Sequence, residues 1–186
     1  MKKKLLASVV AIALVACCVI GGTLAWLTDK TDPVVNTFTV GDVNIDLTET
    51  DGTLTSDGSR SFHIVPGVDI DKDPTVTVKA GSEDCYLFVK IDESANWIDG
   101  MTYSVDRDAG WLDLPGVSGV YYREVSASDA DQVINVLTNQ KVVVSDEITK
   151  EMLNAIETAP TLTFTAYAVQ SAGINSATDA WAEVNG

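Results

Sequence analysis

The chain has 186 residues and a formal net charge of −15, with 27 acidic residues against 12 basic ones. A surface this acidic repels nucleic acids and anionic lipids, so the composition excludes nucleic-acid-binding proteins and proteins that bind membranes through a basic surface. One histidine and three cysteines leave few side chains for a metal centre or a disulfide framework.

The N-terminus has the layout of a secretory signal peptide. Three lysines at positions 2–4 precede an apolar run over residues 5–20, and two glycines and small residues follow it. The run is shorter than the roughly 20 apolar residues that span a bilayer comfortably. We therefore predict that residues 1–25 are a signal peptide, cleaved between Ala25 and Trp26. The mature protein would then be secreted to the cell surface or extracellular matrix, without a membrane segment.

Two alternatives to this cleavage stay open. The first is a retained transmembrane anchor. The second is lipidation of Cys17, because residues 14–17 match a loose lipobox, although the chain stays apolar directly after Cys17. After cleavage at Ala25 only Cys85 remains, so the mature chain would form no internal disulfide and would depend on the packing of its core.

Beyond residue 25, the hydrophobic pattern predicts mainly β-strands. Apolar and polar residues alternate in short runs, and Gly, Pro, Asp and Ser separate the runs. Residues 49–61 are predicted to form an exposed loop, and residues 65–68 a Pro-Gly turn. The predicted strands are residues 36–40, 43–48, 75–78, 85–91, 101–105, 111–114, 119–123, 133–137, 141–144 and 162–169. The pattern predicts a single, mostly β domain built as an antiparallel sandwich or barrel.

One or two short helices are expected in the C-terminal part. Ser145 is a candidate N-cap for a helix over residues 146–157, and residues 176–184 could close the fold with Trp181 packing back. In the strand over residues 85–91, alternation places two sets of side chains on opposite faces. One set is Tyr86, Phe88 and Lys90, and the other is Cys85, Leu87, Val89 and Ile91. Cys85 is therefore predicted to be a small buried hydrophobic residue.

Three segments carry a resemblance to a known family. They are residues 21–29 (GGTLAWLTD), residues 34–49, which contain NTF and GDVNIDL, and the Val65-Pro66-Gly67 turn with the strands around Cys85. In this order they resemble the TasA and CalY (camelysin) family of Gram-positive bacteria, whose signal peptides are removed by a SipW-type signal peptidase. The similarity covers the N-terminal half of the chain, and the C-terminal half only by its strand pattern.

The resemblance implies a jelly-roll-like β-sandwich over residues 41–186 that assembles into extracellular fibres of a biofilm matrix. It also implies that the freed N-terminal segment of one subunit, residues 26–40, adds as a strand to the next subunit. The partners would be further copies of the chain and a related matrix or anchoring subunit. The candidate donor strand is Val34, Val35, Asn36, Thr37, Phe38, Thr39 and Val40. The alternative is that these residues pair within their own sheet.

The sequence predicts no catalytic residue, cofactor or metal. Some members of the family are described as metallopeptidases, but the chain has no His-Glu-x-x-His motif. His63, its only histidine, falls short of the three protein ligands that catalytic zinc normally needs. A serine-hydrolase reading fails for lack of a Gly-x-Ser-x-Gly motif, and Cys85 lies in the middle of a predicted strand, where burial makes a thiol inert.

Two further groups have both a functional and a structural interpretation. Pro74 and Ala80 stand where an EF-hand loop needs glycine and glutamate, so the alternating carboxylates before them form either a looser calcium site or a solvated turn. These carboxylates are Asp69, Asp71 and Asp73. Four aromatic residues could bind glycans but are more typical of a core: Trp97, Trp111, Tyr121 and Tyr122.

The function expected from the sequence is therefore that of a secreted structural subunit of extracellular fibres or biofilm matrix, and not of an enzyme. A monomeric surface module for adhesion or ligand binding, built on the same sandwich, is the alternative. A secreted metallopeptidase is a third reading, and it depends only on the description of some family members.

Overall fold

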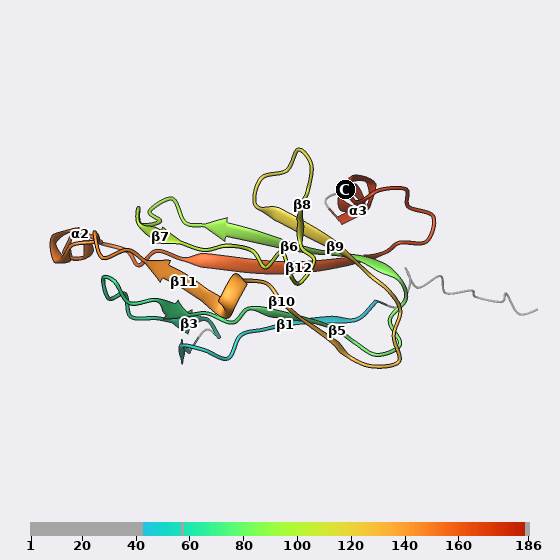
Figure 1. Cartoon of the computed structure of the whole chain (residues 1–186), viewed down its shortest axis with the longest axis horizontal. Helices are drawn as coiled ribbons and strands as arrows, with labels where there is room; N and C mark the ends of the chain where they lie inside the picture. The colour runs from blue at the N-terminus through green and yellow to red at the C-terminus, as the bar shows by residue number, and fades with distance from the viewer. Residues whose placement is uncertain (1–42, 57, 185–186) are drawn as a thin grey trace, which may run out of the picture. The chain divides into compact units, whose positions relative to one another are not determined.

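The structure is a computed structural model that describes residues 43–56 and 58–184 (Figure 1). The predicted signal peptide, its cleavage site at Ala25 and Trp26, and the candidate donor strand over residues 34–40 lie outside the described residues. Within the described part, none of the helices has the length and hydropathy needed to cross a bilayer.

Short strands make up most of the described chain. In order they are β1 (Ile45–Thr48), β2 (Thr53–Leu54), β3 (Arg60–Ser61), β4 (Ile70–Asp71), β5 (Thr75–Val78), β6 (Cys85–Glu93), β7 (Met101–Thr102), β8 (Leu112–Asp113), β9 (Val120–Val125), β10 (Gln132–Asn135), β11 (Lys141–Val144) and β12 (Leu162–Gln170). A 3₁₀ turn, η1 (Thr138–Gln140), precedes β11, and the two α-helices are α2 (Lys150–Asn154) and α3 (Ala177–Val184).

The strands form antiparallel sheets that face each other as a sandwich (Figure 1). One sheet has the order β12-β6-β9-β8, and the sheet that faces it has the order β1-β5-β10, with β4-β11-β7 as a further three-stranded sheet. The chain crosses between the facing sheets from β5 to β6 and again from β9 to β10. Such crossovers are typical of jelly-roll and Greek-key sandwiches. The predicted fold class, a mostly β antiparallel jelly-roll-like sandwich with short helices, is confirmed.

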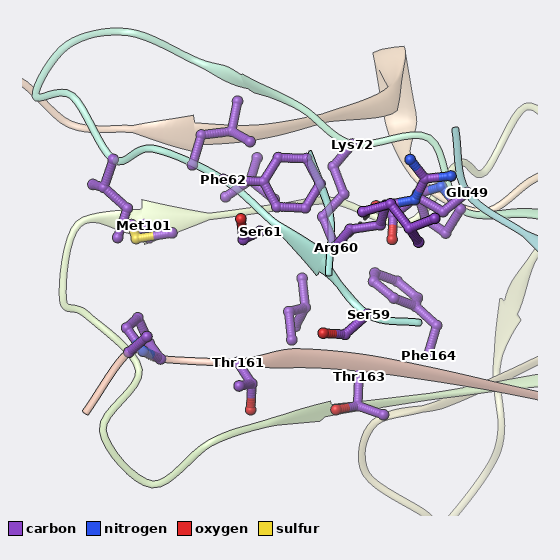
Figure 2. Close-up of a pocket in the computed structure, with 18 of the residues that line it drawn as sticks. Glu49, Ser59, Arg60, Ser61, Phe62, Lys72, Met101, Thr161, Thr163 and Phe164 are labelled. Atoms are coloured by element: carbon purple, nitrogen blue, oxygen red, sulfur yellow. Dashed lines mark hydrogen bonds and ion pairs between the residues drawn. The ribbon is translucent and has the colours of Figure 1, made fainter. Parts of the chain in front are cut away.

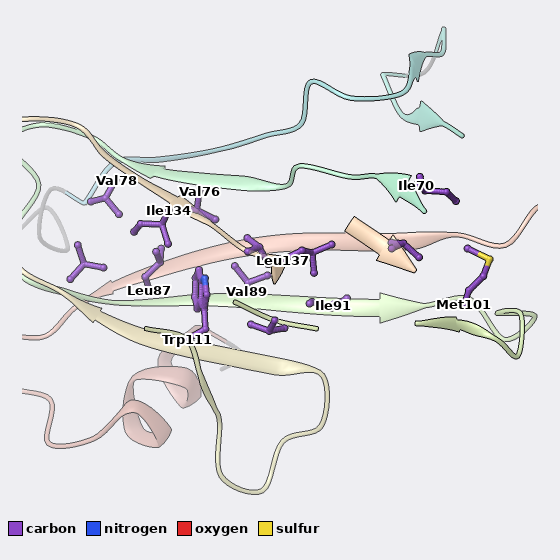
Figure 3. Close-up of a cluster of buried hydrophobic side chains, with 14 of the residues drawn as sticks. Ile70, Val76, Val78, Leu87, Val89, Ile91, Met101, Trp111, Ile134 and Leu137 are labelled. Atoms are coloured by element: carbon purple, nitrogen blue, oxygen red, sulfur yellow. The ribbon is translucent and has the colours of Figure 1, made fainter. Parts of the chain in front are cut away.

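The main hydrophobic core lies between the sheets (Figure 3). β6 contributes one face to it, and the side chains on that face are the four predicted from the alternation: Cys85, Leu87, Val89 and Ile91. Trp111 is completely buried in this core, and its indole Nε1 donates a hydrogen bond to the carbonyl oxygen of Asn135 at 2.8 Å. The buried indole therefore both fills volume and satisfies its polar atom, which is the usual condition for a tryptophan in a core.

The opposite face of β6 is buried by helix α3. Phe88 is fully buried there, and its ring centroid lies 5.2 Å from that of Trp181. Trp181 also meets Tyr167 of β12 edge to face, at 5.3 Å. Ser176 caps the helix, because its hydroxyl accepts a hydrogen bond from the Asp179 N–H at 3.1 Å. The prediction of a closing helix whose Trp181 packs back is confirmed.

The predicted loop over residues 49–61 is instead a small hairpin. Thr53 pairs with Ser61 and Leu54 with Arg60, so that β2 and β3 form a two-stranded sheet of their own. Gly58 has a φ of +85°, a backbone conformation that glycine adopts without a Cβ clash and that the tight turn uses. Strands of two residues are too short to show an alternating pattern, and for this reason the sequence indicated only a loop.

The predicted helix over residues 146–157 is shorter than expected. Ser145 accepts a hydrogen bond from the Glu147 N–H at 3.1 Å and forms a turn, while Thr149 is the N-cap of α2 and accepts from the Met152 N–H at 3.2 Å. Ile148, between the two, is only 3% exposed and packs into the main core. Its burial as the chain leaves β11 delays the start of the helix, so the prediction that Ser145 caps it is wrong.

Candidate functional site

The long strand β12 forms an edge of the four-stranded sheet. Its nine residues pair along their whole length with β6, from Leu162 opposite Glu93 to Gln170 opposite Cys85. On its other side, β12 pairs with no strand among the described residues. An edge of this length presents a row of backbone groups that a further strand can bind.

The register identifies which backbone groups of β12 point outward. Just before β12, the Ser94 N–H donates to the carbonyl of Thr161 at 2.9 Å, and just after it, the Ser171 N–H donates to the carbonyl of Asp84 at 2.8 Å. Hydrogen-bonded pairs alternate along an antiparallel ladder, so the odd-numbered residues of β12 bond to β6. The even-numbered residues direct their N–H and C=O groups to the outer edge: Leu162, Phe164, Ala166, Ala168 and Gln170.

The side chains of β12 alternate in the same way. Phe164, Ala166 and Ala168 pack against the core between the sheets. Tyr167 and Val169 lie on the other face, with the cluster under α3. The two alanine side chains are small, so they project little from the inner face of β12 beside its unpaired edge.

Strand β1 lies beside β12 on the open side of the sandwich (Figure 1). β1 pairs with β5 alone among the described strands, so it is an edge as well. Ile45 of β1 packs against the same core as Ala166 and Ala168. The open side is therefore framed by one edge strand from each of the two facing sheets.

A cavity of about 750 Å³ opens next to this edge, between the β2–β3 hairpin, the end of β1 and the start of β12 (Figure 2). Most of its wall is apolar, and Lys72 and Glu49 form an ion pair at 2.6 Å within it. Its apolar lining residues are Leu47, Leu54, Phe62, Ile64, Ile70, Pro74, Trp97, Met101, Val142, Ala159, Pro160, Leu162 and Phe164. Its volume and composition fall in the range of small-molecule sites, which are about 300–1,000 Å³ and largely hydrophobic.

The residues considered as metal ligands or catalytic groups do not form a cluster in the described structure. His63 is exposed, in the segment between β3 and the Pro-Gly turn. Asp69 lies 3.7 Å from the Lys141 Nζ, whereas Asp73 accepts hydrogen bonds at 2.9 Å from the N–H groups of Thr50 and Asp51. Within the described residues, no group of three or more His, Cys, Asp or Glu side chains could hold a metal ion.

Asp73 has a structural role in the described fold. Partial burial works to raise the pKa of Asp73, but the hydrogen bonds from Asp51 and Thr50 outweigh it, so this pKa lies below its usual value. The ionised carboxylate thereby fixes the chain that leads from β1 into the β2–β3 hairpin. Asp69 and Asp71 are exposed, as the solvated-turn alternative expected, but Asp71 belongs to strand β4 and Asp73 is partly buried.

Cys85 and the four aromatic candidates belong to the core. Burial raises the pKa of the Cys85 thiol to about 11, so the reactive thiolate is scarce near neutral pH. Trp111 is fully buried, Trp97 and Tyr121 pack against the main core, and Tyr122 packs against the cluster under α3. They do not form one exposed platform.

Two features of this site were not found from the sequence. The edge position of β12 depends on strand order, which no local pattern encodes. The cavity brings together residues far apart in the chain, such as Phe62, Lys72 and Phe164. The one available signal was Lys72 itself, a single base among the alternating carboxylates of residues 69–73.

The architecture defines the chain as an antiparallel β-sandwich protein with a long open edge and an adjacent apolar cavity. No protein-family model, curated protein or solved structure matches the chain.

Proposed function

We propose that the protein is a secreted structural subunit of extracellular fibres, in which the edge of β12 accepts the N-terminal strand of another copy. The observation that carries this proposal is the nine-residue edge of β12, left unpaired among the described strands. Strand addition to such an edge gains affinity from backbone hydrogen bonds and specificity from alternate side chains.

The candidate donor strand has a pattern that suits this edge. In an extended segment, Val34, Phe38 and Val40 share one face with Asn36, while Val35, Thr37 and Thr39 share the other. The first face would lie over the core between the sheets, where Ala166 and Ala168 leave room for the larger Phe38. The Thr-rich face would continue the outer surface of β12, where Thr163 and Thr165 lie.

Signal-peptide removal supplies a control on when assembly begins. A donor segment still joined to a membrane-inserted signal cannot extend freely into a neighbouring subunit. Cleavage after Ala25 by a SipW-type signal peptidase would free residues 26–40, and the high negative charge would keep released subunits apart until salt or cations screen their repulsion.

The test compares purified residues 26–186 with residues 41–186 at matched concentrations, by size-exclusion chromatography and negative-stain microscopy. Both hydrophobic clusters lie within residues 43–184, so the shorter chain keeps its core. We expect filaments from the longer chain only. A synthetic peptide of residues 26–40 should bind the shorter chain in a 1:1 ratio, and a Phe38→Lys peptide should bind at least tenfold more weakly.

The outcomes separate assembly from pairing within one chain. If residues 34–40 pair within their own sheet, the longer chain stays monomeric under all salt and pH conditions. The peptide then binds residues 41–186 but does not bind residues 26–186. Monomers of both chains with no peptide binding to either would exclude strand donation altogether.

A second candidate function is that of a monomeric surface module that binds a ligand on the sandwich. The cavity beside β12 favours it, because an apolar enclosure of about 750 Å³ with a charged pair inside has the size and chemistry of a ligand site. Saturable binding by a chain that never assembles would support this function over the fibre subunit.

A further inference from the structure

The cavity beside β12 contains a buried lysine whose environment is unusual for this chain. Lys72 is 7% exposed, and its Nζ lies 4.7 Å from the ring centroid of Phe62 and 5.2 Å from that of Phe164 (Figure 2). Lysine is almost never this buried unless it is paired. Here the pair is Glu49, whose Oε1 accepts the hydrogen bond from Nζ at 2.6 Å.

The ion pair does not use the full capacity of the ammonium group. An ammonium has three N–H donors, and among the described residues the Lys72 Nζ makes one hydrogen bond, to Glu49. The two aromatic faces attract the cation but accept no conventional hydrogen bond. The Lys72 ammonium therefore has unused N–H donors inside a largely apolar cavity, where a hydrogen bond to a further acceptor would be strongly favoured.

A second cation lies in the cavity wall. The Arg60 guanidinium donates to the backbone carbonyls of Thr50 at 3.0 Å and Gly52 at 3.4 Å, and no carboxylate of the described residues lies within ion-pair distance of it. The charged residues of the lining are Arg60, Lys72 and Glu49. The formal charge of the lining is thus positive, although the chain as a whole carries −15.

We propose that this cavity binds an amphipathic monocarboxylate, whose aliphatic or aromatic body fills the apolar chamber and whose carboxylate pairs with Lys72 and Arg60. Charge complementarity selects this class over neutral and cationic amphiphiles, because the carboxylate meets two cations and a single anion. The apolar lining excludes small hydrophilic anions, which would lose their hydration without burying any apolar surface. All the lining residues belong to one chain, so the site requires no second subunit.

Tryptophan fluorescence with decanoate as the probe tests the proposal, since Trp97 lines the cavity. Decanol and decyltrimethylammonium are the neutral and cationic comparison probes, all used below their aggregation concentrations. We expect saturable decanoate binding at least tenfold tighter than that of either comparison probe. The fluorescence change should disappear in Trp97→Phe.

Substituting the charged lining residues distinguishes a site that recognises the carboxylate from one that binds any apolar molecule. The double variant Lys72→Met with Glu49→Leu removes the ion pair without leaving a buried charge unpaired, and Arg60→Gln removes the second cation. Both should weaken decanoate binding at least tenfold and leave decanol binding unchanged. The matched control is Lys141→Met with Asp69→Leu, which removes an ion pair outside the cavity lining and should change neither.

Two results would overturn the proposal. Equal affinity for all three probes would show a non-selective apolar patch, and unchanged decanoate binding in folded charge variants would show that the cations do not recognise it. Thermal unfolding of each variant shows whether it is folded. If the double variant unfolds, Arg60→Gln decides the outcome alone, because Arg60 has no carboxylate partner in the described structure to leave unpaired.

Discussion

The two edges of the four-stranded sheet are built in opposite ways. At one edge, β8 has two residues, and the Arg107 guanidinium binds both carboxylate oxygens of Asp113, at 2.9 and 2.8 Å. At the other edge, β12 has nine residues and no described charged side chain among them. Short strands and charged side chains are common ways of preventing a sheet edge from pairing with another molecule. β8 has this protection, and β12 does not.

This difference is what the proposed acceptor role of β12 requires. A long, uncharged edge is a risk of aggregation unless a specific strand covers it. The β8 edge of the same sheet shows that this fold can include a short, charged edge strand. The contrast is therefore consistent with the proposed acceptor role of β12, and it can be tested one edge at a time.

The largest effect is expected from Ala166→Pro. The Ala166 N–H points to the outer edge, so proline there leaves the bonds to β6 intact but prevents a strand from pairing with β12. Filament formation by residues 26–186 should be lost, as seen by negative-stain microscopy, while the circular dichroism spectrum stays unchanged. Ala166→Ser, which keeps the N–H, should still assemble.

The matched control for the other edge is Asp113→Pro on β8. Leu114 N–H donates to the carbonyl of Val120 at 3.0 Å, so by alternation the Asp113 N–H also points outward. Assembly should be unaffected by this change. Loss of filaments from both proline variants would mean that β12 is not the specific acceptor.

A smaller but clear effect on stability is expected from Thr165→Pro. Thr165 lies in a hydrogen-bonded pair with Lys90 of β6, so proline removes a ladder bond and leaves its acceptor without a partner. The free energy of unfolding should fall by about 2–3 kcal/mol, measured by urea denaturation. Ala166→Pro, one residue away, should lose clearly less. Equal losses would show that the assignment of inward and outward residues on β12 is wrong.

The smallest effect is expected from Arg107→Ala at the protected edge. Arg107 is half exposed, and its ion pair with Asp113 is screened by solvent, so its removal should lower the free energy of unfolding by about 0.5–1 kcal/mol. Arg107→Lys keeps the charge but loses the second guanidinium nitrogen, Nη1, which donates to the Trp111 carbonyl at 3.1 Å, and should fall in between. Urea denaturation of both variants measures this. A loss of more than about 3 kcal/mol in the free energy of unfolding would mean that Arg107 stabilises the fold itself and does not only protect the β8 edge.

Strands in which apolar and polar residues alternate strongly were predicted far better from the sequence than the short strands and the helix α2. β5, β6 and β11 were located closely, because Val76, Leu87 and Val142 alternate with residues on the other face. Short pieces such as β2 and β3 have no period, and the start of α2 was set by burial of Ile148 and not by the first available cap. A local sequence pattern indicates that a position is buried, but it does not indicate which element of the fold covers that position.

The candidate site was less predictable than the fold for the same reason. The apolar pattern of residues 162–169 indicated a strand, yet only the order β12-β6-β9-β8 makes it an edge. In the sequence, Lys72 is only a single base between acidic residues, and only the folded chain places its Nζ near the rings of Phe62 and Phe164. The donor segment over residues 34–40 stays a prediction, since it lies outside the described residues.

The register between β12 and β6 has a mechanical consequence for a fibre. If neighbouring subunits pull on β12 along its axis, the hydrogen bonds of the nine-residue ladder share the tension and must break together in shear. A two-residue strand such as β8, pulled from one end, would instead peel away one bond at a time. β6 contributes side chains to both hydrophobic clusters, so the force passes from β12 to a strand that is buried on both faces. A filament joined at β12 would resist stretching at each subunit rather than only at the joints between them.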